Sequence, residues 1–203
     1  MWNYEKRLEY PINIKETNPK IAKFIMSQYG GPDGEISASL RYLSQRYSMP
    51  YREVMGILTD IGTEEMAHFE MVATIVHQLT RNLTPEEIKE SGFGEYYIDH
   101  TLGIWPQAAG GVPQNACEFQ VKADPITDIM EDMAAEQKAR STYDNILRVV
   151  KDPDVIDPIR FLRAREVVHF QRFGEALRLI QERLDSKNFY ACNPVIDKNC
   201  GRK

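Results

Sequence analysis

The feature that most constrains this chain is a pair of Glu-x-x-His tetrapeptides, which lie 101 residues apart. They begin at Glu65 and Glu166 and end at His68 and His169. In a helix, a spacing of three residues places both side chains on one face, where they can bind the same ion. A single Glu-x-x-His is a weak signal, because the two residues occur three apart by chance in many helices and are then solvated. The surroundings of the two copies decide between these interpretations.

Each tetrapeptide interrupts the apolar stripe of a predicted helix. The stripes read Leu58, Ile61, Glu65, His68, Val72, Ile75 and Leu79 in one helix, and Ile159, Leu162, Glu166, His169, Phe173, Ala176 and Ile180 in the other. This alternation by three and four residues is typical of a helix face that packs into a core. An ionised carboxylate in such a position costs on the order of several kcal/mol unless a cation compensates for it. The pattern therefore indicates buried metal ligands rather than surface salt bridges.

A further glutamate precedes each tetrapeptide. Glu35 and Glu136 each stand 30 residues before the glutamate of a tetrapeptide, and they too are 101 residues apart. Tyr42 and Tyr143 obey the same offset, seven residues after these glutamates and so on the same helix face. The midpoint of each glutamate pair falls beside a proline turn, so each glutamate lies about 15 residues, or roughly 22 Å, from its turn. Folding at the turns brings all six glutamates and histidines to one level.

Proline and glycine divide the chain into two helical hairpins. Long helices are predicted from Asn18-Pro19 to about Tyr47 with an interruption at 30–34, from Ser48 to about Leu79, from Asp124-Pro125 onward, and after Asp152-Pro153 to about Leu184, with a short surface helix from Thr84-Pro85. Residues 92–124 are irregular and too long for a plain connection, and no segment alternates with period two. The sequence predicts an all-α, ferritin-like four-helix bundle of two hairpins joined by a long crossover. Residues 1–185 form this dinuclear-metal bundle and residues 186–203 a polar tail.

The six residues match a known kind of metal site. One inward glutamate from each of two helices, with Glu-x-x-His from each of the other two, is the ligand set of dinuclear carboxylate bundles. Two divalent cations would neutralise the four carboxylates. Tyr42 and Tyr143 are either core aromatics or donors of a hydrogen bond to a metal-bound carboxylate. His77 and His100 fit no spacing and are interpreted as ordinary surface or linker residues. The glycine run at 30–34 kinks the helix or lets another backbone approach the metals.

Composition excludes several other classes of function. The 203 residues carry a formal net charge of −5, which disfavours nucleic acid or an anionic membrane as a partner, because both need a concentrated basic surface. No apolar stretch approaches the roughly 18–20 residues of a membrane span. The first ten residues lack the apolar region of a signal peptide, and the three cysteines form no C-x-x-C pair. We expect a cytoplasmic protein.

Three segments resemble signatures of the manganese catalase family. They are Gly-Gly-Pro-Asp-Gly-Glu at 30–35, Asp-Ile-Gly-Thr-Glu-Glu-Met-Ala-His at 60–68, and Phe-Leu-Arg-Ala-Arg-Glu-Val-Val-His at 161–169. The resemblance covers roughly residues 1–183. The short chain and modest tail are most similar to the spore-coat branch of that family, the CotJC proteins.

The resemblance implies specific roles for the six residues. It makes Glu35, Glu65, His68, Glu136 and His169 the ligands of two manganese ions, with Glu65 as the bridging carboxylate. By symmetry alone Glu166 would be a sixth ligand, but the resemblance implies an outer carboxylate that relays protons. In the implied reaction hydrogen peroxide is disproportionated: one molecule is reduced to water while the metals are oxidised, and a second is oxidised to oxygen as they return.

The resemblance also implies a homo-oligomer, a hexamer in full-length members, with other spore-coat proteins as partners. Two departures stand out. Ala135 occupies a position where some full-length members carry an arginine that controls access to the metals. The chain stops at Lys203, without the longer extension that wraps neighbouring subunits in those members.

Two other functions fit the same bundle. A di-iron ferroxidase or peroxidase would use the same ligand set, since raw affinity favours iron over manganese. No four-cysteine rubredoxin-like module is present, which argues against a peroxidase with built-in electron delivery. A structural coat protein would keep the bundle and its metals for stability while catalysis is minor.

Overall fold

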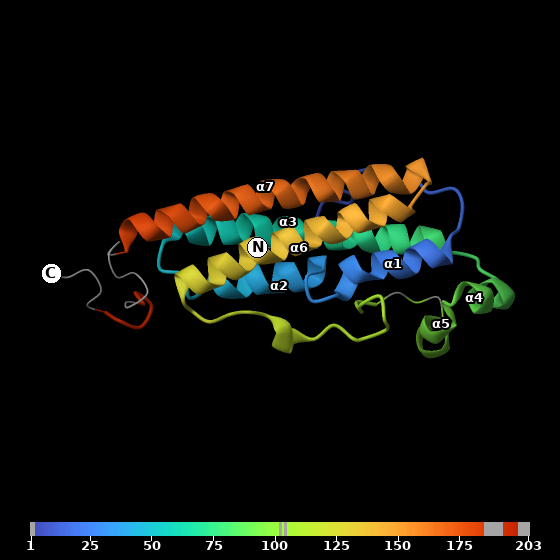
Figure 1. Ribbon diagram of the computed structural model, residues 1–203, viewed down its shortest axis with the longest axis horizontal. Helices are drawn as coiled ribbons and strands as arrows, with labels where there is room; N and C mark the ends of the chain where they lie inside the picture. The colour runs from blue at the N-terminus through green and yellow to red at the C-terminus, as the bar shows by residue number, and fades with distance from the viewer. Residues whose placement is uncertain (1–2, 102, 104, 185–192, 199–203) are drawn as a thin grey trace.

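The long helices lie side by side along the long axis of the molecule (Figure 1). A computed structural model describes residues 3–101, 103, 105–184 and 193–198. Its elements are α1 (Pro19–Gly30), α2 (Glu35–Gln45), α3 (Arg52–Thr80), α4 (Pro85–Ser91), α5 (Gly94–His100), the 3-10 turn η1 (Ala116–Glu118), α6 (Pro125–Val149) and α7 (Pro153–Arg183). In these ranges the only extended pairing is an isolated bridge between Gln107 and Pro113. The all-α class is confirmed.

The long helices form two hairpins. α1 and α2 follow one another along α3, α6 packs along α7, and contacts between α3 and α7 join the two hairpins. From α5, the chain returns along the lower side of the bundle in Figure 1 before it enters α6. This arrangement is the predicted ferritin-like bundle with a long crossover.

Three long helices begin at an Asn-Pro or Asp-Pro pair. The side chain of Asn18 accepts a hydrogen bond from Ile21 N, and Asp124 accepts one from Thr127 N. Asp152 caps α7 in the same way. In each case the capping side chain accepts a hydrogen bond from a backbone N–H that has no partner within the helix. The proline that follows has no backbone N–H and therefore needs no such partner. The predicted helix starts are therefore confirmed.

The core consists of two apolar clusters with the predicted polar layer between them. One cluster includes Ile14, Met71, Val72, Ile75, Ile159 and Leu162, and the other includes Leu58, Ile61, Ile129, Phe173 and Ile180. Along α3 and α7, the Glu-x-x-His positions fall between members of the two clusters. Each fully buried apolar side chain contributes about 1.5–3 kcal/mol, so the polar layer is supported from both sides.

The first helix is broken at the predicted glycine run. Gly30 ends α1, and an added Cβ there would lie 2.2 Å from the backbone nitrogen of Gln107. Only glycine allows the crossover backbone to approach so closely. The break also makes Glu35 the first residue of α2, where the positive end of the helix dipole favours a carboxylate. The run thus breaks the helix, as one of the two expectations had it, and it lets the crossover backbone approach Gly30 closely.

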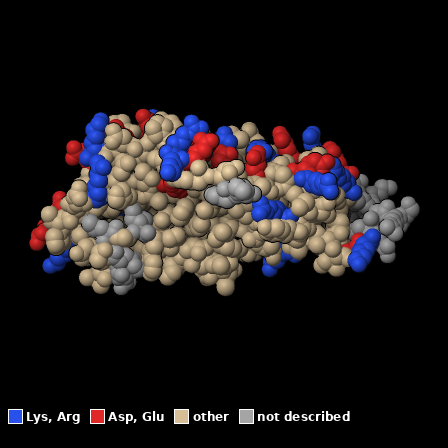
Figure 2. Space-filling model, turned by 180° about the vertical axis from the view of Figure 1, so that it is seen from behind, with Lys and Arg blue, Asp and Glu red and all other residues tan. Residues whose placement is uncertain are grey.

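The crossover is more ordered than predicted and carries few charges. The short helix α5 lies within residues 92–124, which the sequence analysis treated as irregular. Glu118 is the sole charged residue between positions 101 and 121. On the rear face, acidic and basic side chains lie next to one another in the upper part, whereas the lower part is largely uncharged (Figure 2). None of the helices in the described ranges has the length and apolar character of a membrane span.

Replacing Gly30 by alanine tests the close approach of the crossover. The new Cβ would lie 2.2 Å from Gln107 N and 2.4 Å from Pro106 C, both backbone atoms, so the crossover must shift. We expect a loss of about 1–3 kcal/mol in the free energy of unfolding, measured by denaturant titration, and faster proteolysis between residues 105 and 121. Gly56→Ala is the matched control, because its Cβ would meet nothing within 4 Å and alanine favours the helix by about 1 kcal/mol. Equal stability of the two variants would contradict the packing.

Candidate metal centre

Four helices bring the six predicted side chains together in the core. Glu35 comes from α2, Glu65 and His68 from α3, Glu136 from α6, and Glu166 and His169 from α7. Each of these side chains is at most 3% exposed. The turns between the helices lie near the midpoints that the sequence spacing indicated, so the expectation of a single level is confirmed.

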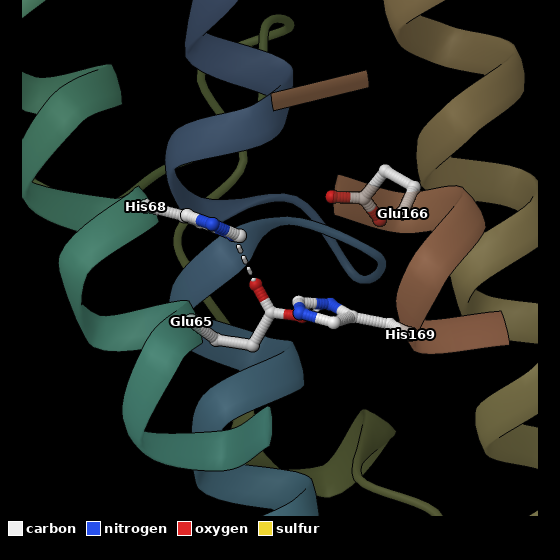
Figure 3. A group of neighbouring side chains, drawn as sticks. All are labelled: Glu65, His68, Glu166 and His169. Atoms are coloured by element: carbon white, nitrogen blue, oxygen red, sulfur yellow. Dashed lines mark hydrogen bonds and ion pairs between the residues drawn. The ribbon is translucent and has the colours of Figure 1, made fainter. Parts of the chain in front are cut away.

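The carboxylate of Glu65 lies between the two histidines. Its Oε2 is 2.8 Å from His68 Nδ1, and its Oε1 is 2.8 Å from His169 Nδ1. The two imidazole rings are 5.5 Å apart at their centroids and nearly parallel, at 22°. Figure 3 shows the three side chains converging from α3 and α7. One oxygen of Glu65 thus faces each histidine, as a carboxylate must to serve two metal ions at once.

A second carboxylate accompanies each histidine. Glu35 Oε2 lies 3.6 Å from His68 Nδ1, and Glu136 Oε2 lies 3.5 Å from His169 Nδ1. Each half of the site therefore offers one imidazole nitrogen, one oxygen of its own carboxylate and one oxygen of Glu65. Residues that are 101 positions apart in the sequence therefore occupy equivalent places in the two halves of the site.

Two tyrosine hydroxyls connect the hairpins at this level. Tyr42 on α2 donates a hydrogen bond to Glu136 Oε1 on α6, at 2.5 Å. Tyr143 on α6 donates one to Glu35 Oε1 on α2. Of the two interpretations open at the sequence level, the structure therefore favours the hydrogen bond, although both rings also pack in the core. Each bond orients a carboxylate so that its other oxygen points toward the histidines.

Glu166 takes a different position from its counterpart Glu65. It points into the same space (Figure 3), and with Glu65, His68 and His169 it offers ligand atoms that all lie within 4.8 Å of one another. In the described part of the chain, however, no hydrogen bond reaches its Oε1 and no ion pair joins it to either histidine. The symmetry of the two tetrapeptides is thus broken at the two glutamates.

Burial and mutual repulsion shift the pKa values of the carboxylates. Burial, reinforced by the charge of Glu65, raises the pKa of Glu35 to about 8. Burial also raises the pKa of Glu136 and, still further, that of Glu166, with neighbouring carboxylates adding to it. For Glu65, burial is outweighed by His169 and His68, which hold its pKa well below the usual range. Protons therefore balance the charge of the site when no metal does so.

The donor set fits a pair of divalent ions. Within the part of the chain that the structure describes, several buried atoms of the site have no hydrogen-bond partner, among them Glu136 Oε2, Glu166 Oε1 and Nε2 of both histidines. Unpartnered buried polar atoms are costly and call for an unseen partner such as water or an ion. Imidazole nitrogens with carboxylate oxygens suit manganese or iron, and the set contains no thiolate. The site can therefore hold a dimetal centre.

Two carboxylates on the outer side of the histidines, Glu64 and Glu9, were not predicted from the sequence. Glu64 Oε1 lies 3.6 Å from His68 Nε2 and 3.3 Å from His169 Nε2. Glu9 Oε2 lies 3.5 Å from His68 Nε2 and lines a surface hollow of about 780 Å³. Glu64 had a sequence signal, since it obeys the 101-residue offset with Arg165. Glu9 lies in an irregular segment and had none.

A buried polar cluster beside the site was also missed. Asp132 precedes Glu136 by one helical turn, is fully buried, and accepts a hydrogen bond of 2.8 Å from Gln45 Nε2. The same nitrogen donates to Gln120 O of the crossover, at 2.9 Å. Burial raises the pKa of Asp132 well above its usual value, although the bond from Gln45 opposes this. The spacing of four residues from Glu136 was the available signal.

The remaining histidines and cysteines contribute nothing to the site in the described ranges. His77 is exposed, in agreement with its interpretation as a surface residue. The side chain of His100 lies outside the described part of the chain. Cys117 is exposed, and Cys192 and Cys200 lie outside the described residues.

Comparisons with known proteins agree with this geometry. Residues 1–189 match the family model described as manganese containing catalase. The chain is 50% identical over 190 residues to Protein CotJC of Bacillus subtilis, covering 94% of this chain and 100% of that one. It is 30% identical over 191 residues to a probable manganese catalase of Clostridium acetobutylicum, covering 93% and 85%. The crystal structure of KatB, a manganese catalase from Anabaena, superimposes with a TM-score of 0.83 at 29% identity, covering 91% and 83%.

The shifted pKa values predict how pH affects the metal-free protein. Glu35 and Glu136 have raised pKa values, and so have His68 and His169, whose burial is outweighed by the attraction of Glu65. Between about pH 5 and 8 the folded chain therefore holds more protons than the unfolded chain, whose groups titrate near 4.3 and 6.5. Stability must then fall as pH rises through this window. The lowered pKa of Glu65 does not oppose this, since its contribution is complete above pH 5.

Thermal unfolding in the presence of a chelator measures this effect. We expect a lower melting temperature at pH 8 than at pH 5.5, and we expect Mn²⁺ at pH 8 to restore it, because the ions replace the lost protons. Glu35→Gln should weaken the dependence. A melting temperature that rises from pH 5.5 to pH 8 without metal would contradict the described charge balance.

Proposed function

The chain belongs to the manganese-containing catalase family, and on this basis we propose that it disproportionates hydrogen peroxide to water and oxygen at a dimanganese centre. The observation that carries the proposal is the position of Glu65, with one oxygen 2.8 Å from Nδ1 of each histidine. A carboxylate placed in this way can bridge two ions, and two metals can share the two electrons of the peroxide reaction, so that no one-electron radical need escape.

Five residues are the proposed ligands. Glu65 would bridge the ions, Glu35 and His68 would hold one of them, and Glu136 and His169 the other. The distances within each half support this division, since each terminal carboxylate lies within about 3.6 Å of the Nδ1 atom of one histidine. The tyrosine hydroxyls would keep the terminal carboxylates in place. The same donor set also accepts iron.

A bound manganese pair would supply two electrons to the peroxide that is reduced and would accept two from the peroxide that is oxidised. Reduction of one peroxide to two waters consumes two protons, and oxidation of a second to oxygen releases two. Glu166 is our candidate for a group that relays these protons, one at a time, between the half-reactions. Its carboxylate is buried in the same space, its Oε1 has no hydrogen-bond partner among the described residues, and burial beside other carboxylates raises its pKa.

The proposed setting is a spore coat. The sequence resemblance to the CotJC branch suggests a protein that is made in the cytoplasm, forms a homo-oligomer and is assembled into the coat with other coat proteins. The 50% identity to Protein CotJC and the alanine at position 135, in place of the arginine of some full-length members, also favour a second function. In that alternative the metals stabilise a coat component that turns over little peroxide.

Metal analysis combined with oxygen evolution tests the proposal. The protein is purified after expression with balanced manganese and iron, its metals are quantified, and oxygen release from peroxide is recorded. We expect about two manganese ions per chain and rapid oxygen release. Metal without turnover would support the structural alternative, and iron with ferroxidase or peroxidase activity would support a di-iron enzyme.

Replacing Glu166 by glutamine tests the proton relay. The amide is similar in size but cannot hold and release a proton, so we expect most of the metal to remain bound while turnover falls by about 10²- to 10⁴-fold. Glu175→Gln is a suitable control, because it alters an exposed residue of the same helix. Oxygen evolution at the wild-type rate by the Glu166 variant would remove this residue from the mechanism, and loss of the metal would make it a ligand.

A further inference from the structure

A single carboxylate lies on the outer side of both histidines. Because each Nδ1 atom faces Glu65, each Nε2 atom points the other way, and both Nε2 atoms are fully buried without a hydrogen-bond partner among the described residues. Glu64 Oε1 lies 3.6 Å from Nε2 of His68 and 3.3 Å from Nε2 of His169. One oxygen atom is thus close to both imidazoles, although they come from different hairpins.

Arg165 holds this carboxylate in place. Its Nε donates to Glu64 Oε1 at 2.5 Å and its Nη2 to Oε2 at 3.2 Å, a two-pronged geometry that orients a carboxylate well. Glu64 and Arg165 directly precede Glu65 and Glu166, so they occupy equivalent positions just before the two tetrapeptides. The approximate two-fold arrangement of the hairpins therefore brings Glu64 and Arg165 together. Because their charges are opposite, Arg165 can hold the carboxylate of Glu64 in place.

An imidazole that binds a metal through Nδ1 carries its proton on Nε2. In a buried site this proton needs an acceptor, because an unsatisfied donor costs about 1–3 kcal/mol. Carboxylates in this outer position fix the ring and make the ligating nitrogen more basic. Glu9 also approaches Nε2 of His68, at 3.5 Å, but it is exposed, and no ion pair in the described part of the chain joins it to His169.

We propose that Glu64, anchored by Arg165, is the positioning residue of the metal centre, accepting the Nε2–H of both histidines and so directing both Nδ1 atoms at the metals. This inference rests on the proposed dimetal function. It assigns Glu64 a role in assembling the site and none in the redox chemistry. The two halves of the centre would then be coupled on their outer side by Glu64, as they are on their inner side by Glu65.

Glu64→Leu tests this role through metal affinity, without reference to catalysis. Free Mn²⁺ is measured by electron paramagnetic resonance while the metal-free protein is titrated. We expect Glu64→Leu to bind Mn²⁺ 10- to 100-fold more weakly than the wild type does. Glu64→Gln keeps an acceptor oxygen and should lose less affinity. Glu9→Gln should lose an amount of affinity between those of the two Glu64 variants. Glu53→Leu is the matched control: Glu53 pairs with Arg183 at 2.9 and 2.7 Å across the same two helices, far from the histidines along the chain. It should bind Mn²⁺ as the wild type does.

Proton NMR of the zinc-loaded protein provides a second readout that a merely structural salt bridge would not change. We expect two downfield imidazole N–H signals that exchange slowly with water in the wild type and in Glu53→Leu, and rapid exchange of both in Glu64→Leu. If Glu64→Leu does not fold, Glu64→Gln and Arg165→Met, which loosens the anchor, are measured in the same way and should exchange faster than wild type.

Three results would overturn the inference. The first two are wild-type affinity for Mn²⁺ in Glu64→Leu and imidazole N–H signals that this substitution leaves unchanged. The third is an additional ion per chain that is lost in Glu64→Leu, because Glu64 would then be the ligand of an outer metal site. These outcomes are distinct from failure of the proposed function. A wild-type protein that binds two manganese ions but releases no oxygen would refute the catalase and leave the positioning role of Glu64 intact.

Discussion

The burial of four carboxylates at one level of a helical bundle is the constraint on which the rest of the structure depends. Each ionised carboxylate costs several kcal/mol in such surroundings, on the order expected for buried ions, unless it is paired. Two histidines face Glu65, two tyrosine hydroxyls bind the terminal carboxylates, and the remaining repulsion appears as raised pKa values. Apolar clusters above and below the layer supply the stability that permits it.

The two hairpins are similar in plan, and the differences between them fall at the metal centre. Glu136 stands inside a continuous helix, whereas Glu35 begins one, because the glycine run ends α1 where the crossover passes. Glu65 lies 2.8 Å from both histidines, whereas its counterpart Glu166 forms an ion pair with neither of them among the interactions of the described residues. On the outer side of the histidines, Glu64 of the first hairpin forms a salt bridge with Arg165 of the second. A repeated scaffold would therefore supply the proposed ligands, and unequal residues at equivalent positions would distinguish the proposed bridging, relaying and anchoring roles.

Much of the fold and the inner site could be predicted from the sequence, because both depend on local rules. Asn-Pro and Asp-Pro pairs specify helix starts, and spacings of three, four and 30 residues place the six side chains at one level. The remaining features depend on contacts between distant segments. The crossed pairing of Tyr42 with Glu136 requires the relative position of the hairpins, the proximity of Glu9 to His68 requires the path of an irregular segment, and α5 has no long apolar stripe to indicate it.

We propose that Glu65 joins two metal ions, one on the Nδ1 side of each histidine. Anomalous diffraction at the manganese absorption edge, recorded from crystals of the manganese-loaded protein, would locate these ions. We expect two peaks, each beside one oxygen of Glu65 and Nδ1 of one histidine, with Glu64 on the far side of both rings. A single peak, or peaks located between Glu9 and Glu64 instead, would contradict this proposal.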